Sequence, residues 1–394
     1  MKFTKLSILA ALAVSAAVAG GDIVPVPAPV VADEASKTTI SGKLTAYYIT
    51  DDGATNYDMF DTDYSQLGLA ATLNVTHQFT ENIAANFSAV GYTNTKNQPN
   101  YFYFEGEQSG AYFNVANLTA TFMDTTFILG RQLLDTPMLG GFDWLLAPGA
   151  FEAYTIANKS IENLTLVGSY VRTWRQNNTG DTWINLTDID DGNNWTIGAA
   201  YDNKTINGSI WYYNVDAGLP ATGIDKYSQI YADAGYNFGT VQVAAQYANT
   251  NYDTAVDSDI FGLKASTTLG GFNLMAAYAN VSDNLAGFVG RDTIYTSSWY
   301  TFASTVMGDS FKVEAGGEFS GVAASISYAY YEYENTSATD NDGHEIDLIL
   351  GYDLKESGID IISAIDLNLV YSNTNWGGNS DDINALEVYA NYKF

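Results

Sequence analysis

The chain of 394 residues contains no cysteine, seven prolines and two histidines, and only 16 basic side chains against 45 acidic ones. Without cysteine there is no disulfide framework and no acceptor for a lipid anchor. The formal net charge of −29 excludes a nucleic-acid-binding protein, because no basic stripe is available to neutralise phosphates. Neither His77 nor His344 belongs to a G-x-S-x-G or H-E-x-x-H motif, so we expect no enzymatic activity and no catalytic residue.

Long apolar runs are also scarce. The first of them, Leu6–Val18, follows Lys2 and Lys5 and ends at an A-x-A site, which predicts a secretory signal peptide over residues 1–19. The run is too short for a spanning helix, and no later window of about 18 apolar residues exists. Residues 20–36 hold three of the seven prolines, so we expect an extended periplasmic leader there, with a tether or plug segment as the sharper alternative.

Tyrosine and glycine are abundant, at 29 and 35 residues. From residue 37 onward, segments of about ten residues alternate between apolar and polar side chains. Leu67, Leu69 and Leu73 share one face of such a segment, and Thr72 and Asn74 share the other. Because side chains alternate across a strand, these segments are predicted to have one apolar and one polar face.

The connections between these segments alternate strictly in length. The short ones fall near residues 80–82, 124–125, 159–162, 203–204, 239–240, 270–271, 320–321 and 355–360. The long ones fall near residues 50–65, 94–111, 133–149, 176–193, 216–227, 251–258, 281–308, 333–342 and 372–382. The pattern predicts an all-β, transmembrane, antiparallel up-and-down β-barrel over residues 37–394. We expect about 18 strands, with about 16 as the alternative, short periplasmic turns and long outer loops.

The last strand points to the same class. Leu386, Val388, Ala390, Tyr392 and Phe394 share one face of it. This ending resembles the C-terminal strand of bacterial outer-membrane barrels, in which a terminal phenylalanine closes the barrel and marks it for insertion. The resemblance implies that Tyr392 and Phe394 serve barrel closure, and that the barrel-assembly machinery is a partner during insertion.

One long loop, residues 133–149, differs from the others because it is apolar and carries two prolines. A loop exposed to water would not need Met138, Leu139, Phe142 or Leu146, whereas a loop folded against the inner wall would bury them. A barrel of about 18 strands is too wide for side chains alone to fill it. We therefore expect this loop to form the constriction of an aqueous channel.

The run Gly130–Pro137, which enters this loop, resembles the segment before the third loop of the major-outer-membrane-protein (Opr-type) porins of Gram-negative bacteria. The resemblance extends over the whole chain in its signal peptide, strand rhythm and C-terminal phenylalanine. It implies an outer-membrane barrel of about 18 strands, a homotrimer surrounded by lipid bilayer and lipopolysaccharide, and passive diffusion of small hydrophilic solutes and ions with a preference for cations.

Charged residues near this loop are candidates for the pore constriction, since rings of charge decide which ions pass. The candidates are Arg131, Asp135, Asp143, Glu152, Arg172 and Arg175. For each of them the alternative is a solvated lumen or loop residue. No cofactor or metal site is expected, although a divalent cation bridging the acidic outer loops is conceivable on oxygen-ligand grounds.

Two other functions remain open. A substrate-specific channel for sugars or organic acids would have the same strand pattern, and Tyr103, Trp211 and Tyr213 could line its lumen. A surface adhesin or structural barrel would lack an open channel. The polar side chains on the predicted lumen face of nearly every strand favour a channel.

Overall fold

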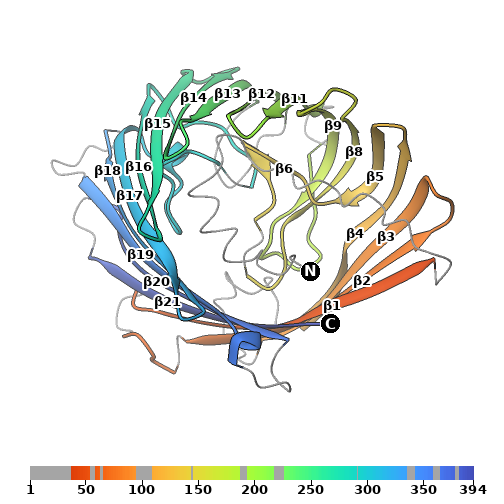
Figure 1. Ribbon diagram of the computed structural model, residues 1–394, viewed down its shortest axis with the longest axis horizontal. Helices are drawn as coiled ribbons and strands as arrows, with labels where there is room; N and C mark the ends of the chain where they lie inside the picture. Colours follow the sequence, from red (N-terminus) through yellow and green to blue (C-terminus); the bar gives the residue numbers. More distant parts are fainter. Residues whose placement is uncertain are drawn as a thin grey trace.

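The chain forms one closed β-barrel in the computed structural model (Figure 1). The structure describes residues 37–53, 58–62, 65–94, 109–142, 145–186, 193–216, 226–290, 292–334, 342–357, 364–377 and 381–394. Within these residues, 18 long strands make up the wall, each antiparallel to its neighbours. The predicted fold class and strand number are confirmed.

The wall strands are consecutive along the chain. The first nine are β1 (Thr38–Asp51), β2 (Gln66–Gln78), β3 (Ile83–Asn94), β4 (Ser109–Phe122), β5 (Thr125–Gln132), β8 (Ala150–Asn158), β9 (Leu164–Arg175), β11 (Asn194–Asp202) and β12 (Ile206–Val215). The other nine are β13 (Tyr227–Asn237), β14 (Val241–Tyr252), β15 (Ser258–Leu269), β16 (Phe272–Ser282), β17 (Gly308–Phe319), β18 (Val322–Glu332), β19 (Asp342–Asp353), β20 (Ile365–Asn375) and β21 (Ile383–Lys393).

The remaining elements are short. The strands β6 (Asp135–Thr136) and β7 (Leu139–Gly140) pair with each other inside the ring of wall strands, and β10 (Ile184–Asn185) pairs with β9. The 3-10 helices η1 (Ala303–Thr305) and η2 (Leu354–Ser357) lie in connections. Among the residues described, no helix combines the length and the apolar character needed to cross a membrane.

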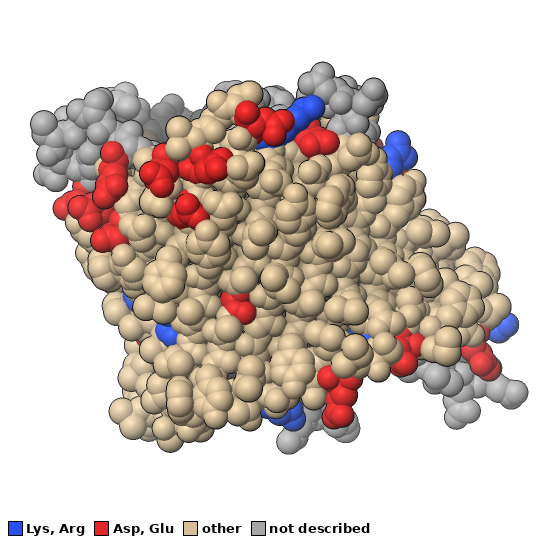
Figure 2. Space-filling model, turned by 90° about the horizontal axis from the view of Figure 1, so that it is seen from above, with Lys and Arg blue, Asp and Glu red and all other residues tan. Residues whose placement is uncertain are grey.

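The wall alternates as predicted, and its apolar face points outward. Leu67, Leu69 and Leu73 of β2 are exposed on the outer surface. On the inner face of β21, Glu387 and Tyr389 are buried under segments inside the barrel. Figure 2 shows a broad outer band with few charged side chains and acidic side chains gathered along one rim. An uncharged belt of this kind is what a lipid-facing wall requires.

The connections follow the predicted asymmetry of length. At one end of the barrel the strands are joined by tight turns such as Gly270–Gly271, where both residues have positive φ, at 61° and 89°. Such primed turns match the twist of paired strands. At the other end, the long-loop end, two of the connections fold into the barrel.

The seam of the barrel lies between β1 and β21. Residues Lys43–Asp51 pair with Ala385–Lys393, and beyond this register Gly42 and Phe394 exchange backbone hydrogen bonds at 2.8 and 3.1 Å. The tip of the Phe394 ring lies over Gly42, where an added Cβ would come within 2.2 Å of Phe394 Cζ. Tyr392 stacks on Phe394 with ring centroids 6.2 Å apart. The role of both aromatic residues in assembly stays a prediction.

We expect the substitution Gly42→Val to weaken this seam, because its side chain must displace the Phe394 ring. Overpacking in a core costs about 1–3 kcal/mol, and we expect the low end of that range here because the Phe394 ring is 57% exposed and can move aside. The loss is measurable as a lower urea midpoint of the folded, heat-modifiable form. Gly91→Val on β3 is the matched control, since a Cβ at Gly91 would meet nothing within 4 Å. If both variants unfold at the wild-type midpoint, Phe394 contributes nothing through its seat on Gly42.

Candidate functional site: two loops inside the barrel

The loop of residues 133–149 lies inside the barrel, as predicted. Met138 and Leu146 are 1% and 0% exposed, and Leu139 and Leu145 are also buried. Asp143 and Trp144 lie outside the described residues. The apolar side chains of the loop therefore pack against the inner wall rather than facing outside water.

The first half of this loop is held by β12. The hydroxyl of Tyr213 accepts a hydrogen bond from Met138 N and donates one to Thr136 Oγ1, both at 3.2 Å. Thr136 Oγ1 also donates to Leu139 O at 2.6 Å, which tightens the β6–β7 hairpin. Tyr213 is buried under the hairpin, so it supports the loop instead of lining an open lumen.

The second half of the loop is held by one buried guanidinium. Arg175, at the end of β9, is 0% exposed and donates from Nη2 to Pro148 O at 2.8 Å and from Nη1 to Gly180 O at 3.1 Å. Its Nε donates to Asn114 Oδ1 at 3.1 Å, and its Cζ lies 4.1 Å from the centroid of the Tyr112 ring. Arg175 thus fixes the point at which the loop returns to the wall.

A second inward segment, residues 283–307 between β16 and β17, was expected only as a long outer loop. Its part from Tyr295 onward runs along the inner wall. Tyr295 N donates to Gln246 Oε1 of β14 at 3.0 Å, and Lys312 of β17 donates from Nζ to Ser297 O at 2.8 Å. The Nζ of Lys264 lies 4.3 Å from the Tyr295 ring centroid. We call this segment the inner strap.

Three wall carboxylates bind the far end of the inner strap. Trp299 donates from Nε1 to Glu387 Oε1 at 2.8 Å and from its backbone N to Asp347 Oδ2 at 3.3 Å. Tyr300 donates from its backbone N to Glu345 Oε1 at 2.7 Å and from its hydroxyl to Glu387. Carboxylates on β19 and β21 therefore satisfy the polar groups of a segment that begins at β16.

The inner strap also contains a buried carboxyl group. Asp292 accepts hydrogen bonds from Ser297 Oγ at 2.7 Å and from Ser304 N at 2.9 Å. Burial raises the pKa of Asp292 above its ordinary value, and the bonds from the two serines oppose this shift. The folded chain therefore holds this proton more tightly than the unfolded chain. The resulting contribution to stability is complete below the ordinary pKa and is lost as the pH rises through the raised pKa.

The two inward loops contact each other across the lumen. Gly140 N donates to Val289 O at 3.0 Å, and Val289 N donates to Met138 O at 2.9 Å. The Phe302 ring lies 5.2 Å from the Phe142 ring and 5.3 Å from the Phe288 ring, measured between centroids. Two joined loops therefore lie inside the barrel, and the sequence predicted an inward position for one of them.

The same signal that identified the first loop was present in the second. The inner strap is poor in charge and carries several large apolar side chains: Leu285, Phe288, Val289, Ile294, Trp299, Tyr300 and Phe302. Apolar content in a long connection is the mark of a loop that folds inward. Its wall partners are distant in the sequence, so the sequence alone did not identify them.

The predicted constriction residues lie in different surroundings. Asp135 lies in the β6–β7 hairpin, inside the barrel, and Arg175 is buried as described. Arg131 follows Phe127 and Leu129 on the outward-facing side of β5, and it is paired in register with Glu152 of β8. Glu152 binds Arg172 at 3.2 Å. A pore role for Arg131, Glu152 and Arg172 stays a prediction that these outward positions do not favour.

Charge at the long-loop end is mostly negative. In the described parts of the long loops the single basic residue is Lys226. The acidic residues there are Asp52, Asp58, Asp61, Asp135, Asp181, Asp216, Asp253, Asp257, Asp283, Asp292, Glu334, Asp381 and Asp382. Of the residues with described positions, no three acidic or histidine side chains are grouped so that they could hold a metal ion.

Comparisons with known proteins agree with this architecture. A model of the Gram-negative porin family matches residues 7–359. OccK9 (OpdG) of Pseudomonas aeruginosa is similar in structure, with a TM-score of 0.75 and 17% identity over 91% of this chain and 98% of that one. OccAB4 of Acinetobacter baumannii gives 0.75 and 15% over the same shares.

Pseudomonas aeruginosa OpdK, whose structure was determined with vanillate, gives a TM-score of 0.73 and 14% identity over 91% of this chain and 98% of that one. No curated protein is similar enough in sequence to be matched to the chain. Because the sequence identities are this low, the solved structures support the fold alone. The family model supports membership of the family.

Proposed function

The chain belongs to the Gram-negative porin family, and we propose that it lets small hydrophilic solutes and ions diffuse passively through a water-filled, cation-preferring channel. Membership places the chain in the bacterial outer membrane as a channel and not as an enzyme. The proposal concerns what the channel passes and which residues decide it.

The observation that carries the proposal is the pair of joined loops inside the barrel. An 18-stranded wall leaves an interior too wide for side chains to fill. The backbone bonds between Gly140 and Val289 hold a crossbar of two loops in that interior. Solutes must then pass between this crossbar and the part of the wall that it leaves uncovered, which limits the size of what diffuses.

Cation preference is supported by the acidic residues of the long loops. Figure 2 shows acidic side chains gathered along one rim of the barrel. A mouth lined with carboxylates raises the local concentration of cations and repels anions. Screening shortens the reach of this field to about 8 Å at physiological ionic strength. The preference should therefore weaken as salt is added.

We expect the double substitution Asp135→Asn and Asp143→Asn to lower the cation-to-anion permeability ratio. Loss of charge at a narrow point removes about 1 kcal/mol of attraction for a cation, or roughly a five-fold change in the ratio. Reversal potentials in planar bilayers under a salt gradient measure it. The matched control removes two carboxylates from the turns at the opposite end, with Asp124→Asn and Asp202→Asn. An unchanged ratio in the loop variant would exclude these two residues as selectivity determinants.

A substrate-specific channel is the second candidate, favoured by the partly exposed Phe142, Phe288 and Phe302 where the two loops meet. Aromatic rings at a constriction would stack on a planar solute. OpdK, which was solved with vanillate, shares the fold. Liposome swelling with a panel of sugars, amino acids and organic acids of equal size separates the two candidates. A general porin sorts the panel by size, and a specific channel sorts it by chemistry.

Further parts of the proposal lie outside the described residues or concern partners. We propose that residues 1–19 are a signal peptide and residues 20–36 a periplasmic leader, both of which precede the described chain. We also propose a homotrimer that is surrounded by lipopolysaccharide and inserted by the barrel-assembly machinery. Light scattering of the purified protein in detergent tests the trimer directly.

A further inference from the structure

Polar side chains lie on the outer surface one step beyond the aromatic residues at the long-loop end. In the β14–β15 hairpin, the hydroxyl of Tyr247 donates to Asp259 Oδ1 at 2.6 Å, and Asn249 Nδ2 donates to the same oxygen at 3.1 Å. Asn249 and Asp259 are register partners, and Tyr247 is paired with the outward-facing Phe261. Two residues of a Tyr-x-Asn sequence therefore engage one carboxylate on the next strand.

The β16–β17 hairpin repeats this arrangement. The hydroxyl of Tyr278 and the Nδ2 of Asn280 both donate to Asp309 Oδ1, each at 2.8 Å. Asn280 is again the register partner of the acidic residue, and Tyr278 is again paired with an outward-facing aromatic residue, Phe311. The Asp309 carboxylate is held by neutral donors beside the aromatic girdle.

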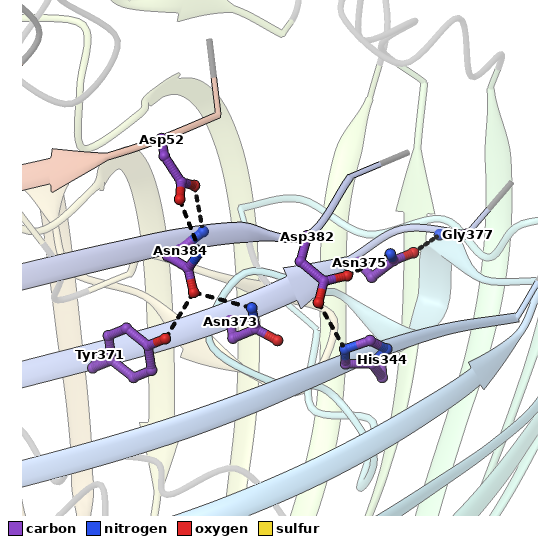
Figure 3. A network of polar contacts seen from close by, with 8 residues as sticks. All are labelled: Asp52, His344, Tyr371, Asn373, Asn375, Gly377, Asp382 and Asn384. Carbon is purple, nitrogen blue, oxygen red and sulfur yellow. Dashed lines mark hydrogen bonds and ion pairs between the residues drawn. The ribbon is translucent and has the colours of Figure 1, made fainter. Parts of the chain in front are cut away.

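An amide replaces the carboxylate in the β20–β21 hairpin (Figure 3). The hydroxyl of Tyr371 donates to Asn384 Oδ1 at 2.7 Å, and Asn373 Nδ2 donates to it at 3.1 Å. Asn384 in turn donates from Nδ2 to Asp52 Oδ2 at 2.8 Å. Three hairpins thus carry amide or carboxylate groups at one level, which we call the polar ring. Amphipathic tyrosines mark the headgroup depth of a membrane, so the polar ring lies beside lipid headgroups.

In one sector of the barrel the polar ring carries positively charged side chains. On β8 and β9 the stacked, outward-facing pair is Tyr154 and Tyr170. One step beyond this pair lie Glu152 and Arg172, and the neighbouring position on β5 is Arg131. Among the described wall strands, these are the only arginine or lysine side chains turned outward in the half of the barrel nearest the long loops.

Both guanidinium groups are held in place while remaining accessible. Arg131 donates from Nη1 to Phe113 O at 3.2 Å, and its Cζ lies 4.2 Å from the centroid of the Trp183 ring. Arg172 donates from Nη1 to Glu152 Oε1 at 3.2 Å, and its side chain is 43% exposed. A guanidinium offers five donors in a planar fork that matches the oxygens of a phosphate.

We propose that Arg131 and Arg172 bind the phosphate of a lipid headgroup in the leaflet around the long-loop end. The polar ring elsewhere presents Asp259 and Asp309, which would repel an anionic headgroup. The sector of β5, β8 and β9 carries two arginines against the single Glu152, so it is the part of the ring whose net charge complements a phosphate. The rings of Trp183, Tyr154 and Tyr170 would flank the lipid at headgroup depth.

The test compares the double variant Arg131→Gln and Arg172→Gln with a control that removes two positive charges from the opposite end, Lys159→Gln and Lys204→Gln. Each protein is refolded in detergent with bisphosphorylated lipid A or with its dephosphorylated form, and bound lipid is counted by native mass spectrometry. We expect the wild type and the control to retain the bisphosphorylated lipid roughly ten-fold more than the arginine variant does. Heat-modifiable migration confirms that all three barrels are folded.

Three results would overturn the proposal. The first is equal retention by the wild type and the arginine variant. The second is equal binding of the dephosphorylated lipid, which would show that acyl chains alone are recognised. The third is a change of oligomeric state in the arginine variant without lipid, which would make this sector a contact between copies of the chain. A competition with millimolar inorganic phosphate distinguishes the two sources of the phosphate. If inorganic phosphate displaces the lipid but is not itself retained, the two arginines bind the phosphate group of a lipid and do not hold free phosphate.

Discussion

Replacing Gly290 by valine is expected to raise the single-channel conductance and to relax the discrimination between solutes. A Cβ at Gly290 would lie 2.0 Å from Gly140 O, which belongs to the other inward loop. The residue also has φ +83°, a left-handed conformation that costs about 1–2 kcal/mol for a side chain with a Cβ. Valine therefore has to separate the two loops at the point where Val289 and Gly140 are hydrogen bonded.

The Gly290→Val variant should also have a lower free energy of unfolding. Two interloop hydrogen bonds contribute about 1 kcal/mol each, so with the backbone strain the variant should lose roughly 3 kcal/mol of stability. Gly271→Val is the matched control, because Gly271 has φ +89° and nothing within 4 Å of an added Cβ. This control imposes the strain without the clash and should conduct like the wild type. If a folded Gly290→Val channel also conducts like the wild type, the crossbar is not held by this contact.

The barrel wall could be predicted from the sequence because it depends on interactions between residues that are close along the chain. A strand alternates with period 2, and each outward side chain must suit lipid whatever its neighbours are. Leu67, Leu69 and Leu73 show this in the printed sequence, and the alternation of short and long connections adds the topology. Apart from the seam between β1 and β21, each wall strand pairs with the next one along the chain, so closure of the barrel is the one distant pairing that the wall needs.

The inner strap could not be placed in the same way because its partners are distant. Trp299 contacts Glu387 across 88 residues, and Tyr300 contacts Glu345 across 45. Nothing in the local pattern of either carboxylate shows that a loop will bind it. Apolar content predicted the inward position of the loop at 133–149, and the same content in residues 283–307 marks the inner strap.

The arginines show a different limit of prediction from sequence, which concerns the face of the wall on which a side chain lies. The position of Arg131 next to the loop of residues 133–149 predicts a pore residue, whereas its strand parity with Phe127 and Leu129 indicates the outer face. Arg172 likewise has the parity of the outward-facing Leu166 and Tyr170, and only beyond it is the ladder interrupted, by a bulge between Glu152 and Ala153 where β8 pairs with β9. A bulge inserts one residue and shifts the pairing that follows. Alternation places side chains reliably only where the ladder is regular.

Arg175 should be the most costly of these arginines to replace. We expect Arg175→Met to lower stability by roughly 4 kcal/mol, because hydrogen bonds from a charged donor contribute about 1.5–3 kcal/mol each and the carbonyls they leave are buried. Methionine keeps an apolar stem of similar length, so the loss reports the guanidinium and not an empty space. The return of the constriction loop at Pro148 then loses one of its two donors, and Asn114 Nδ2 remains.

The measurements are the urea midpoint and the noise of the open channel, since a loop freed at one end should flicker between positions. Arg131→Met is the matched control: the same substitution is made on an outward guanidinium that donates to Phe113 O and lies over the Trp183 ring, where a loss of about 1 kcal/mol or less is expected. Arg175→Lys should fall between the two, because an ammonium lacks the planar fork that reaches Asn114, Pro148 and Gly180 together. Equal midpoints for Arg175→Met and Arg131→Met would mean that the loop is held by its apolar residues alone. The constriction would then depend on Leu145 and Leu146 packed against the inner wall, and not on the guanidinium beneath it.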